Sequence, residues 1–270
     1  MNPHELDSRL RFAVDAARRA GDLALFHARN PDTMGIEVKG IQDVVTVADK
    51  AVEKALRAEL AAVFPHDAML GEEEGITPGW DGVAPLWIVD PIDGTANFAR
   101  RLPLWCISIG LYAGGEPVLG VIHNPVTDEL HAAAKGRGAT LNGMPIRASA
   151  VSSPQHARIN LGFSYRRDPT LHVASIERLL TRECEYSRLG SGALGMAYVA
   201  DGRFEGYFEP HINSWDVAAG IVIVREAGGF TNDFFAGDDR LKRGNAILAG
   251  APGMRGFLED TLSDLMAGEA

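Results

Sequence analysis

The stretch from Trp87 to Phe98, WIVDPIDGTANF, constrains the fold of this chain more than any other. It opens with a short apolar run, residues 86–89, which has a proline on either side and ends at the carboxylate of Asp90. A run of this kind predicts a buried strand followed by a turn. A strand would hold Asp90 on a rigid element. A second carboxylate follows at Asp93, and Asp is a residue type that caps a following helix.

The two residues after the second carboxylate favour an anion. Gly94 lets a ligand approach the backbone closely. The N–H groups of Gly94 and Thr95 would point out of a helix N-terminus, where phosphate binds well. Two carboxylates beside such a turn would repel phosphate unless a cation lies between them, and Mg²⁺ bridging carboxylates and phosphate resolves the conflict. Because Asp, Pro and Gly are common turn residues, the stretch alone is also compatible with an ordinary turn.

Composition narrows the classes of function. The chain has 270 residues, 46% hydrophobic and 23% charged, as in ordinary globular proteins. Its formal net charge of −10 argues against a nucleic-acid partner, and an acidic protein that handles phosphate needs metal ions. The two cysteines, Cys106 and Cys184, form no CxxC pattern, which predicts reduced thiols and a cytoplasmic location. The first residues do not resemble a signal peptide, and no apolar run approaches about 18 residues, so we expect no membrane partner.

Three further segments supply acidic residues. Thr46 and Asp49 have the spacing of a capping box, so Asp49 alone would be interpreted as a helix-start residue. Three consecutive acids, Glu72–Glu74, follow a short apolar run, and a run of acids usually marks a solvated loop. We choose Glu72 as a candidate ligand because it is the nearest of the three to the strand end. Asp216 lies in the first turn of an apolar helix, where it would also complement the helix dipole. Carboxylates from four segments together predict one metal site.

The pattern of apolar residues predicts an α/β (α+β) protein with two lobes. Residues 1–148 would form an N-terminal α+β lobe that carries the metal motifs, and residues 149–270 a C-terminal α/β lobe that completes the site. The expected helices are 5–28, a second one after the Thr46–Asp49 capping box that ends before Pro65, and then 171–180, 192–200, 217–227 and 257–266. The expected strands after the central stretch are 105–112, 117–123 and 129–134 in an antiparallel meander, then 158–163, 206–209 and 245–249.

Two motifs point to other chemistries. Gly190–Gly195 fits GxGxxG, and Glu209 is close to the spacing of a ribose-binding acid. The polar residues 183–188 before it make a poor buried strand, so we favour a substrate-facing helix N-terminus over a dinucleotide site. The segment Asp90–Thr95 resembles the nucleophile loop of haloacid dehalogenase-like phosphatases, but it carries one extra residue. That residue changes the direction of the second carboxylate and weakens the aspartyl-nucleophile hypothesis.

Taken together, these stretches resemble the inositol monophosphatase family of lithium-sensitive, magnesium-dependent phosphatases. The resemblance covers nearly the whole chain. Four ordered motifs carry it: Asp43–Asp49, Gly71–Glu73, Trp87–Phe98, and Trp215–Gly220 with its continuation Glu226–Gly229. It implies a layered α/β/α/β/α sandwich, with an antiparallel-sheet lobe and a mixed α/β lobe, that forms a homodimer.

The resemblance also implies roles for individual residues. The Mg²⁺ ligands would be Glu72, Asp90, the Ile92 carbonyl, Asp93 and Asp216. The residues that position and deprotonate the attacking water would be Glu72 and Thr95, with Asp49 nearby. The substrate contacts would be Gly94 and Thr95 at the phosphate, Ser191, Gly192, Ala193 and Glu209 at the alcohol, and also Asp93 and Asp216.

The expected activity is therefore Mg²⁺-dependent hydrolysis of a small phosphate monoester by water, without a phosphoenzyme. Neither cysteine begins a Cys-x5-Arg loop, and no Ser-His-Asp order is evident. One competing hypothesis is a phosphatase with Asp90 as the nucleophile. Another is a binding module without activity, although such a module has no need of the acidic set.

The alcohol is the open question. Glu209 can accept hydrogen bonds from hydroxyl or ammonium groups. We expect inositol 1-phosphate, as the resemblance implies. Histidinol phosphate, or another sugar or nucleotide phosphate, is the alternative, because Asn213 replaces a typical polyol-site residue.

Overall fold

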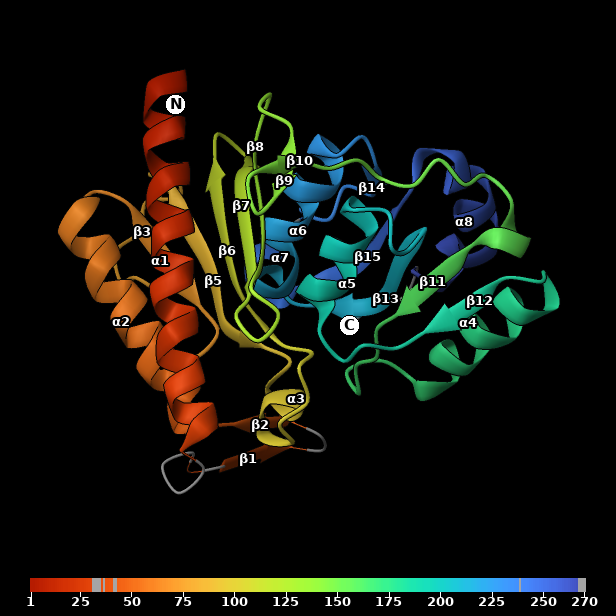
Figure 1. Ribbon diagram of the computed structural model, residues 1–270, viewed down its shortest axis with the longest axis horizontal. Coiled ribbons are helices and arrows are strands. Elements are labelled where there is room, and N and C mark those ends of the chain that lie inside the picture. The colour runs from red at the N-terminus through yellow and green to blue at the C-terminus, as the bar shows by residue number, and fades with distance from the viewer. Residues whose placement is uncertain (31–34, 36, 41–42, 238, 267–270) are drawn as a thin grey trace.

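The computed structural model describes residues 1–30, 35, 37–40, 43–237 and 239–266. Its elements stack in five layers, helices alternating with two sheets (Figure 1). The outer helices α1 and α2 cover an eight-stranded sheet, α5 and α6 lie between the two sheets, and α4 and α8 cover a five-stranded sheet. This arrangement confirms the expected α/β/α/β/α sandwich.

The first helical layer is built to pack closely. The helix α1 (Pro3–Arg29) begins at Asn2, whose side chain forms a capping box with Glu5. Its buried face consists mainly of alanines, which lets the helix backbone approach the sheet. The helix α2 (Val47–Val63) begins at Thr46 with the capping box expected from the sequence.

The eight-stranded sheet has the strand order β10-β9-β8-β7-β6-β5-β3-β4. Every neighbouring pair is antiparallel except β3 and β5, which are parallel. The expected meander is confirmed by β6, β7 and β8. The bounds of the strands are β3 (Ala68–Gly71), β4 (Gly75–Ile76), β5 (Leu86–Asp93), β6 (Cys106–Ala113), β7 (Glu116–Asn124), β8 (Glu129–Ala134), β9 (Ala139–Leu141) and β10 (Met144–Pro145).

The strand β5 departs from the prediction. A turn was expected directly after Asp90, but the strand continues to Asp93 and all its residues are buried. A β-bulge accounts for this, because Asp90 pairs with Ser108 while Asp93 pairs with Cys106, so two residues of β5 oppose one of β6. In a regular strand, residues three apart point to opposite faces. The bulge breaks this alternation and lets both carboxylates face the same site.

The second sheet is mixed, as expected, with the strand order β12-β11-β13-β15-β14. The strand β11 runs parallel to both of its neighbours, β12 and β13, and the remaining pairs are antiparallel. The polar segment expected to make a poor buried strand forms β12, an edge strand whose Glu185 and Tyr186 are exposed. The bounds are β11 (Arg158–Leu161), β12 (Glu185–Ser187), β13 (Gly206–Ile212), β14 (Phe230–Thr231) and β15 (Asn245–Gly250).

The remaining helices follow the predicted order. The central layer contains α5 (Gly192–Ala200) and α6 (Ser214–Glu226), and the outer layer α4 (Pro169–Thr181) and α8 (Arg255–Leu262). The helix α6 begins three residues earlier than expected because Asn213 caps it. The short elements are β1 (Glu37–Gly40), β2 (Asp43–Val45), α3 (Thr95–Ala99), α7 (Arg240–Arg243) and the 3₁₀ turns Pro154–His156, Pro252–Met254 and Ser263–Leu265.

The helix α6 packs closely against the first sheet. Gly110 on β6 and Gly120 on β7 face this helix, and a Cβ atom on Gly120 would lie 2.2 Å from the carbonyl oxygen of Ala219. The helix backbone therefore rests directly on the first sheet. Because α6 also packs against α5 and β15, it belongs to both halves of the molecule, and the division into lobes at residue 148 stays a prediction. In the described ranges, no helix combines the length and apolar character needed to cross a bilayer.

Candidate metal centre and active site

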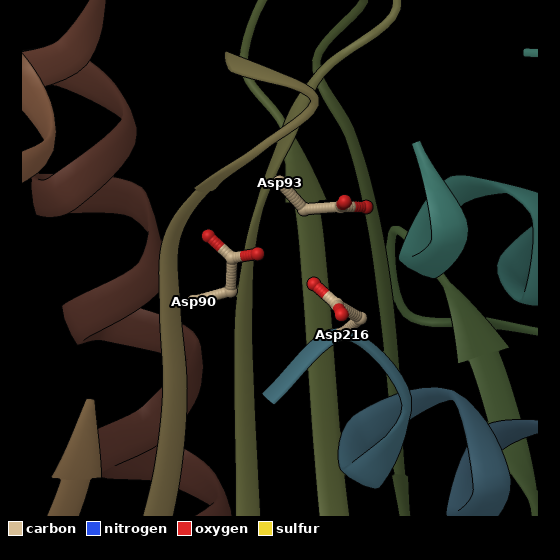
Figure 2. Close-up of side chains that lie close together, drawn as sticks. All are labelled: Asp90, Asp93 and Asp216. Carbon is tan, nitrogen blue, oxygen red and sulfur yellow. The ribbon is translucent and has the colours of Figure 1, made fainter. Parts of the chain in front are cut away.

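Three aspartates from two elements meet between the sheets. Asp90 and Asp93 come from the end of β5 and Asp216 from the first turn of α6, and their carboxylates point toward one another (Figure 2). One oxygen from each lies within 4.8 Å of the others. Asp90 and Asp93 are only 2% and 6% exposed. The structure thus brings together three of the predicted metal ligands.

Local hydrogen bonds orient each carboxylate. The backbone N–H of Ile92 donates to Oδ1 of Asp90 at 2.9 Å, inside the bulge. The N–H of Asn213 donates to Oδ2 of Asp216 at 3.0 Å, which is the return half of the α6 capping box. These bonds orient the two carboxylates, which also share a hydrogen bond with each other.

Asp93 does not cap the helix that follows it, so that expectation is wrong. The cap of α3 is Gly94, with φ of +93°, and no side chain takes part. Instead Asp93 accepts hydrogen bonds at the start of α5, from the Ser191 hydroxyl at 2.5 Å and the Ala193 N–H at 2.7 Å. The Cys106 thiol is a weaker donor at 3.7 Å. Asp93 therefore links the first sheet to the central helices.

Burial and neighbouring charges disfavour the ionised forms of the three aspartates. Burial raises the pKa of Asp90 well above its usual range, and the charges of Glu72 and Asp93 raise it further. Burial also raises the pKa of Asp93, against the lowering effect of its hydrogen bonds. Burial and the charge of Asp93 raise the pKa of Asp216 to about 7. A bound divalent cation would offset this repulsion, and a donor set of carboxylate oxygens suits a hard cation such as Mg²⁺.

The structure places Glu72 near Asp90. It lies in the turn between β3 and β4, and the parallel pairing of Gly71 with Val89 puts it next to Asp90. The effect of its charge on the pKa of Asp90 reflects the same proximity. Its role as a metal ligand stays a prediction.

Asp49 and Thr95 form a second group at the edge of the cluster. Asp49 is 1% exposed, and its Oδ2 accepts the N–H and hydroxyl of Thr46 at 2.8 and 2.5 Å. Its Oδ1 accepts the Thr95 hydroxyl at 3.2 Å. The same hydroxyl lies 3.0 Å from the Ile92 carbonyl oxygen. Asp49 therefore completes the capping box of α2 and also contacts Thr95. Its interpretation as a helix-start residue and its expected place near the attacking water are compatible.

A cavity of about 170 Å³ opens beside the cluster. Its lining includes five residues expected at the substrate: Asp93, Ser191, Gly192, Glu209 and Asp216. Three other residues expected at the substrate, Gly94, Thr95 and Ala193, are not in this lining, and Ala193 is fully buried with its N–H donating to Asp93.

Several residues that line the cavity were not predicted. The Tyr207 hydroxyl donates to Oε2 of Glu209 at 2.6 Å, and burial raises the pKa of Glu209 to about 8. Tyr207 could have been found, because residues two apart on a strand share a face. Asn160 lies opposite Tyr207 only through the pairing of β11 with β13, which the sequence does not reveal. The exposed Arg188 also lines the cavity, with its guanidinium 5.9 Å from the ring of Phe163.

Comparison with known proteins identifies the family. The sequence profile of the inositol monophosphatase family matches residues 5–264. The chain belongs to the inositol monophosphatase family. Members of this family are metal-dependent phosphatases that act on small phosphorylated substrates, so the protein is a phosphoric monoester hydrolase.

Individual family members resemble this chain over nearly its full length. The Nus factor SuhB of Salmonella typhimurium is 37% identical over 263 residues, which are 95% of this chain and 98% of the relative. The structure of the extragenic suppressor protein suhB from Bartonella henselae has a TM-score of 0.87 at 35% identity and covers 94% of this chain and 98% of its own. The inositol monophosphatase of Anabaena sp. PCC 7120 has a TM-score of 0.83 at 34% identity, with coverage of 96% and 97%.

Proposed function

We propose that this phosphatase hydrolyses inositol 1-phosphate in a Mg²⁺-dependent reaction in which water attacks phosphorus directly. The observation that carries the proposal is the cluster of Asp90, Asp93 and Asp216, of which Asp93 and Asp216 line a cavity together with Glu209. The carboxylates provide a place for metal and phosphate. The cavity provides a place for the alcohol.

The residues of the cluster fit Mg²⁺. The oxygens that would hold it are those of Glu72, Asp90, the Ile92 carbonyl, Asp93 and Asp216. All are hard donors. Burial raises the pKa of each of the three aspartates, and neighbouring carboxylate charges raise those of Asp90 and Asp216 further. When bound, Mg²⁺ would supply Lewis acidity, lowering the pKa of water and offsetting the charge of the phosphate.

The chain's own groups would orient the water and take up its proton. Because the Thr95 hydroxyl donates to Asp49 at 3.2 Å, the lone pairs on its oxygen are free to accept a hydrogen bond from the attacking water. Glu72, in the adjacent turn, would take the proton. The N–H groups of Gly94 and Thr95, at the start of α3, would donate to the phosphate. These roles follow the family resemblance.

The site offers no good covalent nucleophile, which supports direct attack by water. Cys106 is fully buried, and burial raises the pKa of its thiol well above its usual range. The Ser191 hydroxyl donates to Asp93 and lies beside no histidine that could activate it in the described hydrogen bonds. Rapid quenching with labelled substrate should therefore trap no phosphoenzyme. An acid-stable phosphate on Asp90 would instead establish the aspartyl-nucleophile mechanism.

Two features of the cavity favour a neutral polyol over a cationic amino alcohol. Glu209 already accepts the Tyr207 hydroxyl, and the other lone pairs of its carboxyl group are suited to substrate hydroxyls. Arg188 lines the same cavity, and its charge acts on Glu209, so an ammonium group there would meet a like charge. The alternatives are histidinol phosphate, a sugar phosphate or a nucleotide phosphate. The name of the Anabaena neighbour, inositol monophosphatase, agrees with the polyol.

The test compares kcat/KM for inositol 1-phosphate and histidinol phosphate in the natural protein and in Glu209→Gln. The matched control is Glu177→Gln, at an exposed position on α4. We expect the natural protein to prefer inositol 1-phosphate. A preference for histidinol phosphate of more than about tenfold that Glu209→Gln abolishes would show that the inositol assignment is wrong.

We also propose a cytoplasmic homodimer. The resemblance implies the dimer, and sedimentation of the purified protein tests it. The free, buried thiols of Cys106 and Cys184 are compatible with a reducing compartment.

A further inference from the structure

A fully buried carboxylate lies outside the roles assigned so far. Glu53 is on α2, one helical turn after Asp49, and is 0% exposed. Its Oε2 accepts the N–H of Glu73 at 2.7 Å, and its Oε1 accepts the N–H of Glu74 at 2.9 Å. The guanidinium of Arg57 donates to Oε1 at 2.7 Å. A buried charge is stable only with such partners, and here most of them belong to one turn of the chain.

That turn carries Glu72. It connects β3 to β4, and Glu53 binds the two N–H groups that directly follow Glu72. At the start of the turn, a Cβ atom on Gly71 would lie 2.2 Å from Oε1 of Glu53, so only glycine leaves room for the carboxylate. At its end, Arg57 donates to the carbonyl oxygen of Gly75 at 2.9 Å. The Glu53–Arg57 pair therefore contacts the turn at both of its ends.

We propose that Glu53 is a positioning residue for the metal centre: it fixes the turn so that Glu72 faces Asp90. This inference rests on the proposed Mg²⁺ site. The same helix holds Asp49, which accepts the Thr95 hydroxyl, so one rigid element aligns two segments of the site. Groups behind a metal site that hold its ligands in place raise the affinity for the metal.

The test is Glu53→Gln, which keeps the size of the side chain. A glutamine amide has a single acceptor oxygen, and its NH₂ group would face an N–H donor, so at least one bond to the turn is lost. We expect the Mg²⁺ concentration for half-maximal activity to rise at least tenfold. Calorimetric titration with Mg²⁺ alone should show the same loss of affinity.

The matched control is Glu59→Gln, on the same helix, where the carboxylate pairs with Arg19 at the surface. It should change neither Mg²⁺ measurement. Gly71→Ala, which displaces the same turn from the opposite side, should repeat the effect of Glu53→Gln and serves if that variant does not fold.

The outcomes separate the two proposals. If the natural protein binds no Mg²⁺ in calorimetry, the proposed metal site is wrong and this inference falls with it. In another outcome, the natural protein binds Mg²⁺, and the variant Glu53→Gln (or Gly71→Ala in its place) binds it equally well. The metal site then stands. Glu53 is then only a structural residue, and the inference is overturned even if the melting temperature falls.

Discussion

Replacing Glu209 with glutamine should flatten the pH dependence of stability in the metal-free protein. Burial, together with the charges of Asp216 and Asp93, raises the pKa of Glu209 from 4.5 to about 8 in the folded state. In the unfolded chain the group titrates near its ordinary value. Between these two pKa values the folded state holds a proton that the unfolded state lacks. The contribution of Glu209 to stability is therefore complete below the unfolded pKa and is lost as the pH rises toward 8.

The size of the effect follows from this difference of one proton. Between the unfolded-state and folded-state pKa values of Glu209, each pH unit changes the free energy of unfolding by about 1.4 kcal/mol. From about pH 5.5 to about pH 7.5 the loss amounts to roughly 2.7 kcal/mol. Glutamine keeps an acceptor for the Tyr207 hydroxyl but does not titrate, so Glu209→Gln should lack this component.

Urea unfolding monitored by circular dichroism in excess chelator measures the effect at three pH values across this range. The natural protein, Glu209→Gln and the exposed-site control Glu177→Gln are compared. The natural protein and the control should lose stability in parallel as the pH rises, and Glu209→Gln should lose less. If the free energy of unfolding changes with pH by the same slope in all three proteins, the carboxyl group of Glu209 is ionised at neutral pH and its pKa is not raised.

Three further predictions concern the metal and the packing. Excess chelator should abolish phosphate release and Mg²⁺ should restore it, whereas undiminished turnover in chelator would contradict the metal dependence. Asp93→Asn removes a charge from the cluster and an acceptor from the start of α5, so kcat/KM at saturating Mg²⁺ should fall roughly 100-fold or more, and wild-type kinetics would show that Asp93 is no ligand. Gly120→Ala places a methyl group against the Ala219 carbonyl and should lower the free energy of urea unfolding by about 1–3 kcal/mol, while an unchanged midpoint would mean that α6 can shift.

Much of the site could be predicted because its signals are local. The capping box of Thr46 and Asp49, the apolar run before Asp90 and the strands of the meander each depend on residues close in sequence, and the structure confirms them. The bulge in β5 left a signal that was misinterpreted. Pro91 after an apolar run predicts a turn, but a proline inside a strand also marks a bulge, where its missing N–H costs no ladder bond.

The remaining features depend on packing between distant segments. Asp93 accepts N–H groups at the start of α5, about one hundred residues further along the chain, and no local pattern distinguishes this from a cap on α3. The hydrogen bonds of Glu53 to the turn at Glu73 and Glu74 likewise require α2 to lie beside β3.

The close seat of α6 on Gly110 and Gly120 limits how the enzyme can move during turnover. The backbone of α6 contacts one sheet directly, and its other side packs against α5 and β15. The helix therefore cannot act as a hinge for a domain-opening motion. Substrate entry and product release must then depend on the surface loops around the cavity, such as the one that carries Arg188. Those loops can change in evolution without disturbing the carboxylates, so one catalytic frame can serve different alcohols.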